Sequence, residues 1–198
     1  MTQLFFNGWA SPIELFKNKR NFICHKDFCN TFVPFDERRF DIVAYSMGCH
    51  AAINFCLKHP KKVNTTTLIA YRKEYPSSEI RVMCQNLSKN PRSTLIHFYK
   101  KSIPIPEDWK YFKSHILDQA LQAWSSQYLI TLLKYAEKNF SHNSLEKISQ
   151  NITFIHAEND NIAPLSEIIP LLRSKDLLIT HNYGHLPFLN KNFSWEQV

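Results

Sequence analysis

Short runs rich in β-branched and aromatic residues recur along the chain with segments of different character between them. These strand-like runs lie at residues 3–7, 41–45, 65–70, 151–156 and 177–180, with a shorter one at 21–24. Helix-like sequence follows at 49–58 and again at 162–173, where Pro164 and Pro170 interrupt it. Strands that alternate with helices form a mostly parallel central sheet flanked by helices, so the sequence predicts the α/β class.

Residues 72–148 break this alternation. The segment begins with polar sequence punctuated by prolines and continues, over residues 109–138, as an amphipathic run that predicts two helices. We expect a helical cap, inserted before the strand at 151–156 and lying over the carboxyl edge of the sheet. An apolar stripe within it either packs the cap or forms a pocket wall; its members are Leu129, Leu132, Leu133 and Ala136.

The overall composition favours one compact unit. A chain of 198 residues with 44% hydrophobic content suffices for a single domain spanning residues 1–198. Because no apolar run approaches the roughly 20 residues of a membrane span and the start lacks a basic leader, we expect a cytoplasmic protein without membrane association. We also expect it to be a monomer. The five cysteines include no C-x-x-C pair, which favours buried, reduced thiols over disulfides or a zinc site.

Glycine is scarce: the chain has only Gly8, Gly48 and Gly184. Each is therefore expected where a side chain would clash or where φ must be positive. Gly48 ends the run Ala-Tyr-Ser-Met-Gly, in which Ser46 lies between a predicted strand and a predicted helix. This is the context of a nucleophile elbow, with Ala44 replacing the first glycine of G-x-S-x-G. The alternative is a serine that only caps the following helix.

A nucleophilic serine requires a base and an acid that orients the base. Asp160 follows the strand at 151–156, with Glu158 as a rival acid. His185 follows the last strand, and Gly184 is expected to give its loop the freedom to aim the ring at Ser46. The order serine, aspartate, histidine, each after a different strand, is the order of α/β-hydrolases. We therefore predict the catalytic triad Ser46, Asp160 and His185.

Stabilising a tetrahedral oxyanion requires hydrogen-bond donors. The backbone N–H of Met47, next after the nucleophile, and that of Trp9 in the loop after the first strand are predicted to supply them. Gly8 is expected to let this loop approach the substrate, so Gly8 and Trp9 are also predicted substrate contacts. The Trp9 indole either lines the acyl pocket or belongs to the core.

No motif points to a cofactor or a metal. The chain has no glycine-rich phosphate loop and no zinc-binding set. His181 and His185 have a helical metal-ligand spacing, but Gly184 and the preceding strand argue against a helix there.

The chain is basic, with a formal charge of +7 from 24 Lys and Arg against 17 Asp and Glu. The window from Ile80 to Pro106 contains no acidic residue and holds Arg81, Lys89, Arg92, Lys100 and Lys101. Such a surface attracts a polyanion, and the charge alone leaves open a nucleic acid, an acidic protein or a phosphorylated ligand. The alternative is a solvated charged face.

Four motifs together resemble the pimeloyl-acyl-carrier-protein methyl ester esterases of biotin synthesis, especially their short BioG-like members. They are Leu-Phe-Phe-Asn-Gly-Trp near the start, Ala-Tyr-Ser-Met-Gly, Asp160 after its strand, and Gly-His-Leu-Pro-Phe after the last strand. The likeness spans the core but does not extend to the cap. Relative to larger hydrolases, the leading hairpin has no residues here, which implies a trimmed fold, and the junction at 72–75 lacks the expected glycine.

The resemblance implies an α/β-hydrolase fold and hydrolysis of the methyl ester on a pimeloyl chain carried by acyl carrier protein, without a cofactor. Because acyl carrier proteins are acidic, the basic window then has an expected partner that is not a nucleic acid, with Arg92, Lys100 and Lys101 as predicted docking residues. Two other functions stay open. One is a generalist short-acyl carboxylesterase or thioesterase, and the other is a non-catalytic α/β-hydrolase scaffold that binds an acidic partner.

Overall fold

A computed structural model describes residues 2–12, 15, 22–25, 39–140 and 142–195. Six strands form one sheet: β1 (Thr2–Phe6), β2 (Phe22–His25), β3 (Phe40–Tyr45), β4 (Val63–Ile69), β5 (Ile152–Ala157) and β6 (Leu177–His181). Their order is β2-β1-β3-β4-β5-β6, and every neighbouring pair is parallel. The predicted α/β class with a parallel central sheet is confirmed.

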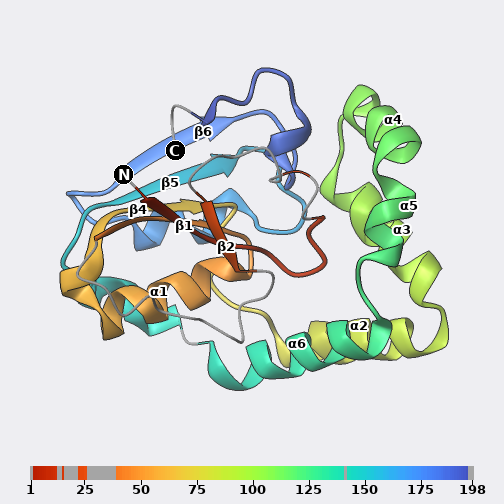
Figure 1. Ribbon diagram of the computed structural model, residues 1–198, viewed down its shortest axis with the longest axis horizontal. Coiled ribbons are helices and arrows are strands. Elements are labelled where there is room, and N and C mark those ends of the chain that lie inside the picture. Colours follow the sequence, from red (N-terminus) through yellow and green to blue (C-terminus); the bar gives the residue numbers. More distant parts are fainter. Residues whose placement is uncertain (1, 13–14, 16–21, 26–38, 141, 196–198) are drawn as a thin grey trace.

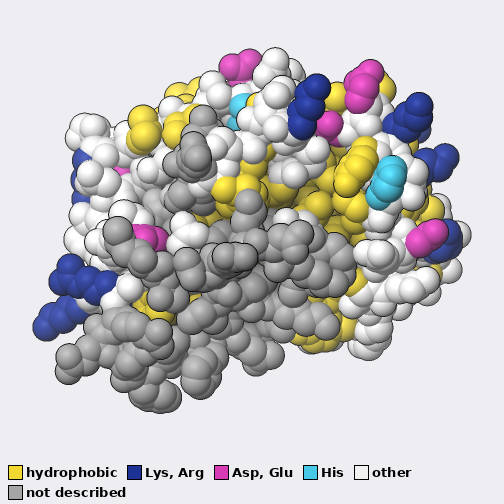
Figure 2. All heavy atoms as spheres, turned by 45° about the horizontal axis from the view of Figure 1, so that its top comes forward, with side chains coloured by type: hydrophobic (Ala, Val, Ile, Leu, Met, Phe, Trp, Pro, Cys, Tyr) yellow, Lys and Arg dark blue, Asp and Glu magenta, His cyan; other side chains and the backbone are white. Residues whose placement is uncertain are grey.

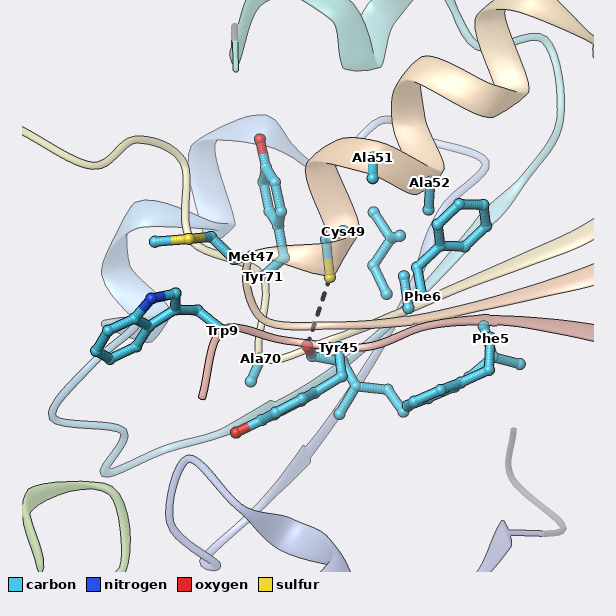
Figure 3. Packing of buried hydrophobic residues seen from close by; sticks show 14 of the residues in the cluster. Phe5, Phe6, Trp9, Tyr45, Met47, Cys49, Ala51, Ala52, Ala70 and Tyr71 are labelled. Carbon is cyan, nitrogen blue, oxygen red and sulfur yellow. Dashed lines mark hydrogen bonds between the residues drawn. The ribbon is translucent and has the colours of Figure 1, made fainter. Parts of the chain in front are cut away.

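Strands β3, β4 and β5 each end in four consecutive buried residues, so both faces of the sheet are covered toward the carboxyl ends of these strands. Successive side chains of a strand point to opposite faces, and the adjacent residues Phe5 and Phe6 show this alternation. The Phe6 ring lies 5.8 Å from that of Phe55 on helix α1 (Gly48–Lys58), whereas the Phe5 ring lies 6.4 Å from that of Trp195 on the other face. Figure 3 shows α1 on the Phe6 side of the strands.

The carboxyl ends of four adjacent strands are joined by backbone hydrogen bonds just beyond the regular pairing. The Ser46 N–H donates to the Ile69 carbonyl at 2.8 Å, and the Ala70 N–H donates to the Ile155 carbonyl at 2.9 Å. The Glu158 N–H then donates to the His181 carbonyl at 2.8 Å. The turns that leave β3, β4 and β5 are therefore each tied to the next strand.

Five helices occupy the predicted cap segment: α2 (Ser77–Lys89), α3 (Pro91–Ser102), α4 (Pro106–His115), α5 (Leu117–Gln122) and α6 (Ser126–Asn139). In Figure 1 they lie together beside the strands. The prediction of two helices over 109–138, preceded by irregular sequence, was wrong. Pro91 and Pro106 stand at the first helical positions, where the missing N–H costs nothing, and Asn90 caps α3 by accepting from the Ser93 N–H. These prolines begin helices instead of interrupting them.

The helix expected at 162–173 does not form. Residues Leu165–Glu167 and Ile169–Leu171 make two separate 3-10 turns. Pro170 lacks the N–H that a continuous helix would use, so the chain is divided into these short turns. Other 3-10 turns lie at Pro60–Lys62, His142–Lys147 and Pro187–Leu189.

Cys49 and Cys56 are buried free thiols, and Cys84 is a half-buried one. The expectation for Cys24 and Cys29 falls on side chains outside the described residues. Within the described ranges, none of the helices has the length and apolar character that crossing a membrane requires.

Candidate active site

Ser46 lies at the tight turn between β3 and α1 with a φ of 51°. This left-handed conformation is unusual for a residue other than glycine and is the strained geometry of a nucleophile elbow. The turn also presses the start of α1 against the end of β1. A Cβ on Gly48 would lie 2.4 Å from the Phe6 carbonyl oxygen and 2.6 Å from that of Asn7. Glycine is required here by close backbone approach, since its φ is not positive.

The predicted base lies directly against the predicted nucleophile. Ser46 Oγ and His185 Nε2 are 2.9 Å apart, and His185 Nδ1 lies 2.7 Å from Asp160 Oδ2. With Nδ1–H donating to the carboxylate, Nε2 is the acceptor for the Ser46 hydroxyl. The His185 ring is only 1% exposed and lies 5.4 Å from the Tyr45 ring. The structure therefore brings all three predicted triad residues together.

Gly184 does not supply the loop freedom that was expected of it. Its φ is not positive, so the backbone conformation is open to other residues. The constraint is space, because a Cβ would lie 2.2 Å from Pro104 Cδ and 2.5 Å from the Ser102 carbonyl oxygen. The turn that carries His185 thus packs directly on the segment that follows α3.

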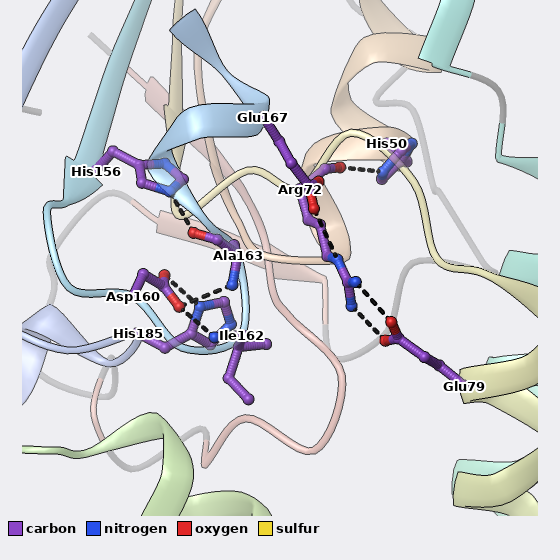
Figure 4. Close-up of polar contacts among 9 residues, drawn as sticks. All are labelled: His50, Arg72, Glu79, His156, Asp160, Ile162, Ala163, Glu167 and His185. Atoms are coloured by element: carbon purple, nitrogen blue, oxygen red, sulfur yellow. Dashed lines mark hydrogen bonds and ion pairs between the residues drawn. The ribbon is translucent and has the colours of Figure 1, made fainter.

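Asp160 is the carboxylate that reaches His185 (Figure 4). Its other oxygen, Oδ1, accepts from the backbone N–H groups of Ile162 and Ala163, both at 2.8 Å. Burial acts to raise the pKa of Asp160, but His185 and the two amides outweigh it and the pKa is lowered. The rival Glu158 is exposed and accepts from Thr180 Oγ1 at 3.3 Å, so it does not face His185.

The two predicted oxyanion donors belong to buried residues next to this array. The backbone N–H groups of Met47 and Trp9 have no hydrogen-bond acceptor among the described residues. The neighbouring Gly8 N–H donates to Asn7 Oδ1 at 2.9 Å, while Asn7 Nδ2 donates to the Ser11 carbonyl at 3.3 Å. Asn7 therefore shapes the loop after β1 and leaves the Trp9 amide available.

A cavity of about 560 Å³ lies between the carboxyl edge of the sheet and the cap. Its sheet side includes Trp9 and Met47, and its cap side comes largely from α2, α3 and α6. The Trp9 indole lines this cavity and is also fixed within the core, because Nε1–H donates to the Leu129 carbonyl at 3.0 Å. Gly8 does not line it, since its Cβ position faces the Tyr45 ring at 2.8 Å.

Both interpretations of the apolar stripe on α6 apply, each to different residues. Leu133 lines the cavity, whereas Leu129, Leu132 and Ala136 are buried without lining it. The stripe therefore packs the cap and contributes one residue to the cavity wall.

The three predicted docking residues do not share one face of α3. Arg92 and Lys101 are separated by nine positions, about 2.5 turns, and so point to opposite sides of the helix. Arg92 pairs with Asp118 at 3.4 Å, and both side chains are largely exposed. Lys100 and Lys101 are exposed in the last turn, and Lys101 also lines the cavity. On the face shown in Figure 2, some basic side chains lie close to acidic ones.

The sequence interpretation missed a polar cluster at the cap junction. Both terminal nitrogens of Arg72 donate to the carboxylate of Glu79, at 2.7 and 3.0 Å, and Nε lies 3.9 Å from Glu167 (Figure 4). His50 Nε2 lies 2.9 Å from the Arg72 carbonyl, and Tyr75 lines the cavity. The available signal was the polar and aromatic run directly after a strand, at the edge where site residues collect.

The described residues contain no group of three or more His, Cys, Asp or Glu side chains placed to hold a metal ion. His181 ends β6 and His185 lies in the following turn, so their spacing of four is not helical.

Solved structures share this architecture. An esterase from Exiguobacterium antarcticum superposes with a TM-score of 0.75 at 14% identity, covering 96% of this chain and 86% of its own. The enol-lactonase from Burkholderia xenovorans LB400 superposes with a TM-score of 0.74 at 10% identity, and the match covers 94% of this chain and 85% of the lactonase. An α/β hydrolase enzyme from a Medee basin deep-sea metagenome superposes with a TM-score of 0.71 at 15% identity, and the match covers 94% of this chain and 82% of that enzyme.

In sequence, the chain is similar to the pimeloyl-[acyl-carrier protein] methyl ester esterase of Nitrosomonas europaea, with 25% identity over 170 residues. The match covers 77% of this chain and 66% of that protein, so the chain spans about two thirds of its relative. No family model matches the sequence. The chain has the α/β-hydrolase fold and resembles a pimeloyl-acyl-carrier-protein methyl ester esterase.

Proposed function

We propose that this protein is a serine carboxylesterase in which Ser46 is the nucleophile, His185 the base and Asp160 the acid. The observation that carries the proposal is the unbroken hydrogen-bonded series from Ser46 Oγ through the His185 ring to Asp160, with distances of 2.9 and 2.7 Å. A nucleophile, a base and an acid that orients the base are the parts that acyl transfer requires.

In this mechanism the Ser46 hydroxyl transfers its proton to His185 Nε2 while Oγ attacks the ester carbonyl carbon. The backbone N–H groups of Met47 and Trp9 stabilise the oxyanion. The protonated imidazole is held by Asp160 and gives its proton to the departing alkoxide, which leaves as the alcohol. A water then loses a proton to the same nitrogen and attacks the acyl-enzyme. Collapse of this second tetrahedral intermediate releases the acid and restores Ser46.

The proposed substrate is the methyl ester of a pimeloyl chain bound to acyl carrier protein. The sequence likeness to the Nitrosomonas europaea esterase supports it, and the physical fit is a cavity of about 560 Å³, within the range of small-molecule sites. Apolar side chains such as Met83, Phe98 and Leu133 suit the methylene chain. The products would be methanol and pimeloyl-acyl carrier protein.

The partner would be the acyl carrier protein itself. Carrier proteins are acidic, and Lys100 and Lys101 are exposed at the end of α3, with Lys101 at the cavity. Arg92 lies at the other end of the helix and is paired with Asp118, so we propose a smaller contribution from it.

The function is tested by assaying the protein on pimeloyl-carrier-protein methyl ester and on a short chromogenic ester. Wild type should hydrolyse both, and Ser46→Ala should lose at least about 10⁴-fold in kcat on each, because the nucleophile is gone. Ser114→Ala, an exposed serine on α4, is the matched control and should retain full rate.

The products separate the remaining possibilities. Methanol release supports the methyl esterase, whereas release of free carrier protein with monomethyl pimelate would identify a thioesterase. Activity on the chromogenic ester alone would favour a generalist carboxylesterase. If wild type cleaved neither substrate, the site would be non-catalytic and the fold a binding scaffold.

Carrier docking needs its own measurement. Charge reversal of Lys100 and Lys101 to glutamate should raise KM for the carrier-bound ester much more than for the chromogenic ester, because only the carrier-bound ester uses the protein surface, whereas the change at Lys101 in the cavity wall affects both. Arg92→Glu is the comparison and should have the smaller effect. An unchanged KM in the double variant would rule out docking through the end of α3.

A further inference from the structure

Tyr75 lies in the segment between β4 and α2 and lines the cavity together with Met47 and Trp9. Its hydroxyl oxygen is buried and makes no well-oriented hydrogen bond within the described residues. Leaving a buried hydroxyl without a partner costs free energy, and in a cavity wall a ligand or a reacting group can supply that partner.

Tyr75 lies close to the turn that carries the nucleophile, because it lines the cavity together with Met47, the residue next to Ser46. Burial raises the pKa of Tyr75, whereas the side chain of Ser46 is close enough to lower it by hydrogen bonding. The net shift is upward, so the phenol stays protonated at neutral pH and is available as a donor.

The contacts of Tyr75 place it on the α1 side of Ser46. Its ring lies 5.7 Å from that of His50, which belongs to the first turn of α1, the turn that follows Met47. His185 instead packs against Tyr45. Tyr75 is therefore close to the start of α1, next to the predicted Met47 oxyanion donor.

The Tyr75 ring is held in this position by Arg72, which is itself bound by two neighbours. The Arg72 guanidinium lies over the ring, 5.5 Å from its centroid, in a cation–π contact. The same guanidinium is bound by both oxygens of Glu79, in the first turn of α2. His50 Nε2 contacts the Arg72 backbone carbonyl. The segment is thus fixed both to α1 and to the cap, which orients the hydroxyl before substrate arrives.

We propose that the Tyr75 hydroxyl donates a third hydrogen bond to the oxyanion, beside the backbone N–H groups of Met47 and Trp9; the inference rests on the proposed esterase function. As the bond from Ser46 Oγ to the carbonyl carbon forms, the C=O π pair moves onto oxygen, and the Tyr75 O–H shortens its hydrogen bond to that charge. No proton is transferred, and the π bond re-forms when the alkoxide leaves. The Tyr75 hydroxyl, which has no well-oriented acceptor among the described residues, thereby gains one in the transition state.

The test compares Tyr75→Phe with Tyr71→Phe on the chromogenic ester. Tyr71 is the matched control, because its hydroxyl is also buried without a partner in the described part of the chain and its ring also contacts His50, yet it does not line the cavity. We expect kcat of Tyr75→Phe to fall about 100-fold, as for loss of a single oxyanion donor, with KM unchanged. Tyr71→Phe should equal wild type.

A transition-state probe gives an independent readout. Alkyl trifluoromethyl ketones add to an active-site serine and place a charged oxygen where the oxyanion forms, so their affinity should weaken in Tyr75→Phe by a factor similar to the fall in kcat. Neither variant should lower Tm, since each loses only a hydroxyl that makes no well-oriented hydrogen bond within the described part of the chain.

The outcomes separate the two proposals. An active wild type with an equally active Tyr75→Phe would overturn the role of Tyr75 and leave the esterase standing. Equal losses in Tyr75→Phe and Tyr71→Phe would indicate a packing effect and would also overturn it. A wild type that neither hydrolyses an ester nor binds the ketone would overturn the esterase, and this inference with it.

Discussion

The carboxyl edge of the sheet and the helical cap meet at one cavity, but they are built by different rules. At the sheet edge, Ser46, Asp160 and His185 follow three separate strands, and backbone hydrogen bonds join the strand ends. In the cap, position is set by side-chain packing between helices. The sheet edge is therefore a fixed frame for a common chemistry, whereas the cap supplies a wall whose shape depends on individual side chains.

This difference has a functional counterpart. Substitutions at the sheet edge should change kcat for every ester alike, because they alter the reacting groups. Substitutions in the cap should change KM for long acyl chains and spare short ones, since they alter only the wall of the cavity.

The largest expected effect is on the acid. Asp160→Asn should lower kcat about 10⁴-fold on short and long esters equally, because an amide no longer holds His185 in the tautomer that accepts from Ser46. Glu158→Gln, a nearby exposed carboxylate that faces Thr180, should keep the wild-type rate. Steady-state kinetics on both esters measures this. A comparable loss in Glu158→Gln would transfer the acid role to that residue.

The next largest effect is expected at Gly184, where the turn that carries His185 contacts the cap. Gly184→Ala would bring a Cβ to 2.5 Å from the Ser102 carbonyl oxygen and 2.2 Å from Pro104, and a backbone atom cannot yield as a side chain can. We expect a loss of about 1–3 kcal/mol of unfolding free energy, with Tm lower by several degrees. Calorimetry measures the shift. Pro104→Ala in the same chain should restore only part of it, and full restoration would show that the Ser102 contact is unimportant.

A smaller effect is expected inside the cap. Met83 lines the cavity from α2, and Met83→Ala should raise KM for a pimeloyl-length ester by about tenfold, from loss of about 1.5 kcal/mol of apolar contact. The rate on an acetyl ester should stay the same. Ile169→Ala, which removes an exposed apolar side chain away from the cavity, is the control. Equal effects of Met83→Ala on both esters would contradict the assignment of the reaction chemistry to the sheet edge and of substrate selection to the cap.

The smallest expected effect is the contribution of His181 to the pH dependence of the free energy of unfolding. Burial, with a contribution from His156, lowers the pKa of His181 to about 4, although Asp160 and Glu158 act to raise it. Between that value and about 6.5, the unfolded chain binds a proton that the folded protein does not, so the free energy of unfolding falls as pH falls across this window.

His181→Gln should reduce the difference in unfolding free energy between pH 7 and pH 5 by an amount of the order of 1 kcal/mol. The partial exposure of His181 keeps this amount small, because solvent screens the charge. Urea unfolding at pH 7 and pH 5 measures it, with exposed His97→Gln as the control. A slope in His181→Gln equal to that of wild type would show that His181 does not take part.

The sequence predicted the sheet edge well because its signals are local. Ser46 lies between a strand pattern and a helix pattern, and scarce glycines mark the turns that carry Ser46 and His185. The cap was predicted poorly, because Pro91 and Pro106 suggest interruption in sequence but begin helices in the structure. Gly184 was assigned flexibility, because its steric partners lie some 80 positions away and leave no local trace.

The roles of Arg72, Glu79 and Tyr75 were missed for the same reason. No short-range pattern shows that Arg72 will be bound by Glu79 or that the hydroxyl of Tyr75 will be buried beside the cavity. These facts depend on how the cap helices pack onto the sheet. Local sequence thus identifies the chemistry more readily than the groups that tune it.

The contact of Gly184 with Ser102 and Pro104 makes the end of α3 and the histidine turn a single mechanical unit. Because the space between them is too small for one methyl group, the end of α3 cannot move toward Gly184 without displacing the turn that carries His185. A shift of the last turn of α3, where Lys100 and Lys101 are exposed, would displace the His185 imidazole through direct steric contact. Alignment of His185 with Ser46 therefore depends on the position of a helix that contributes nothing to the triad.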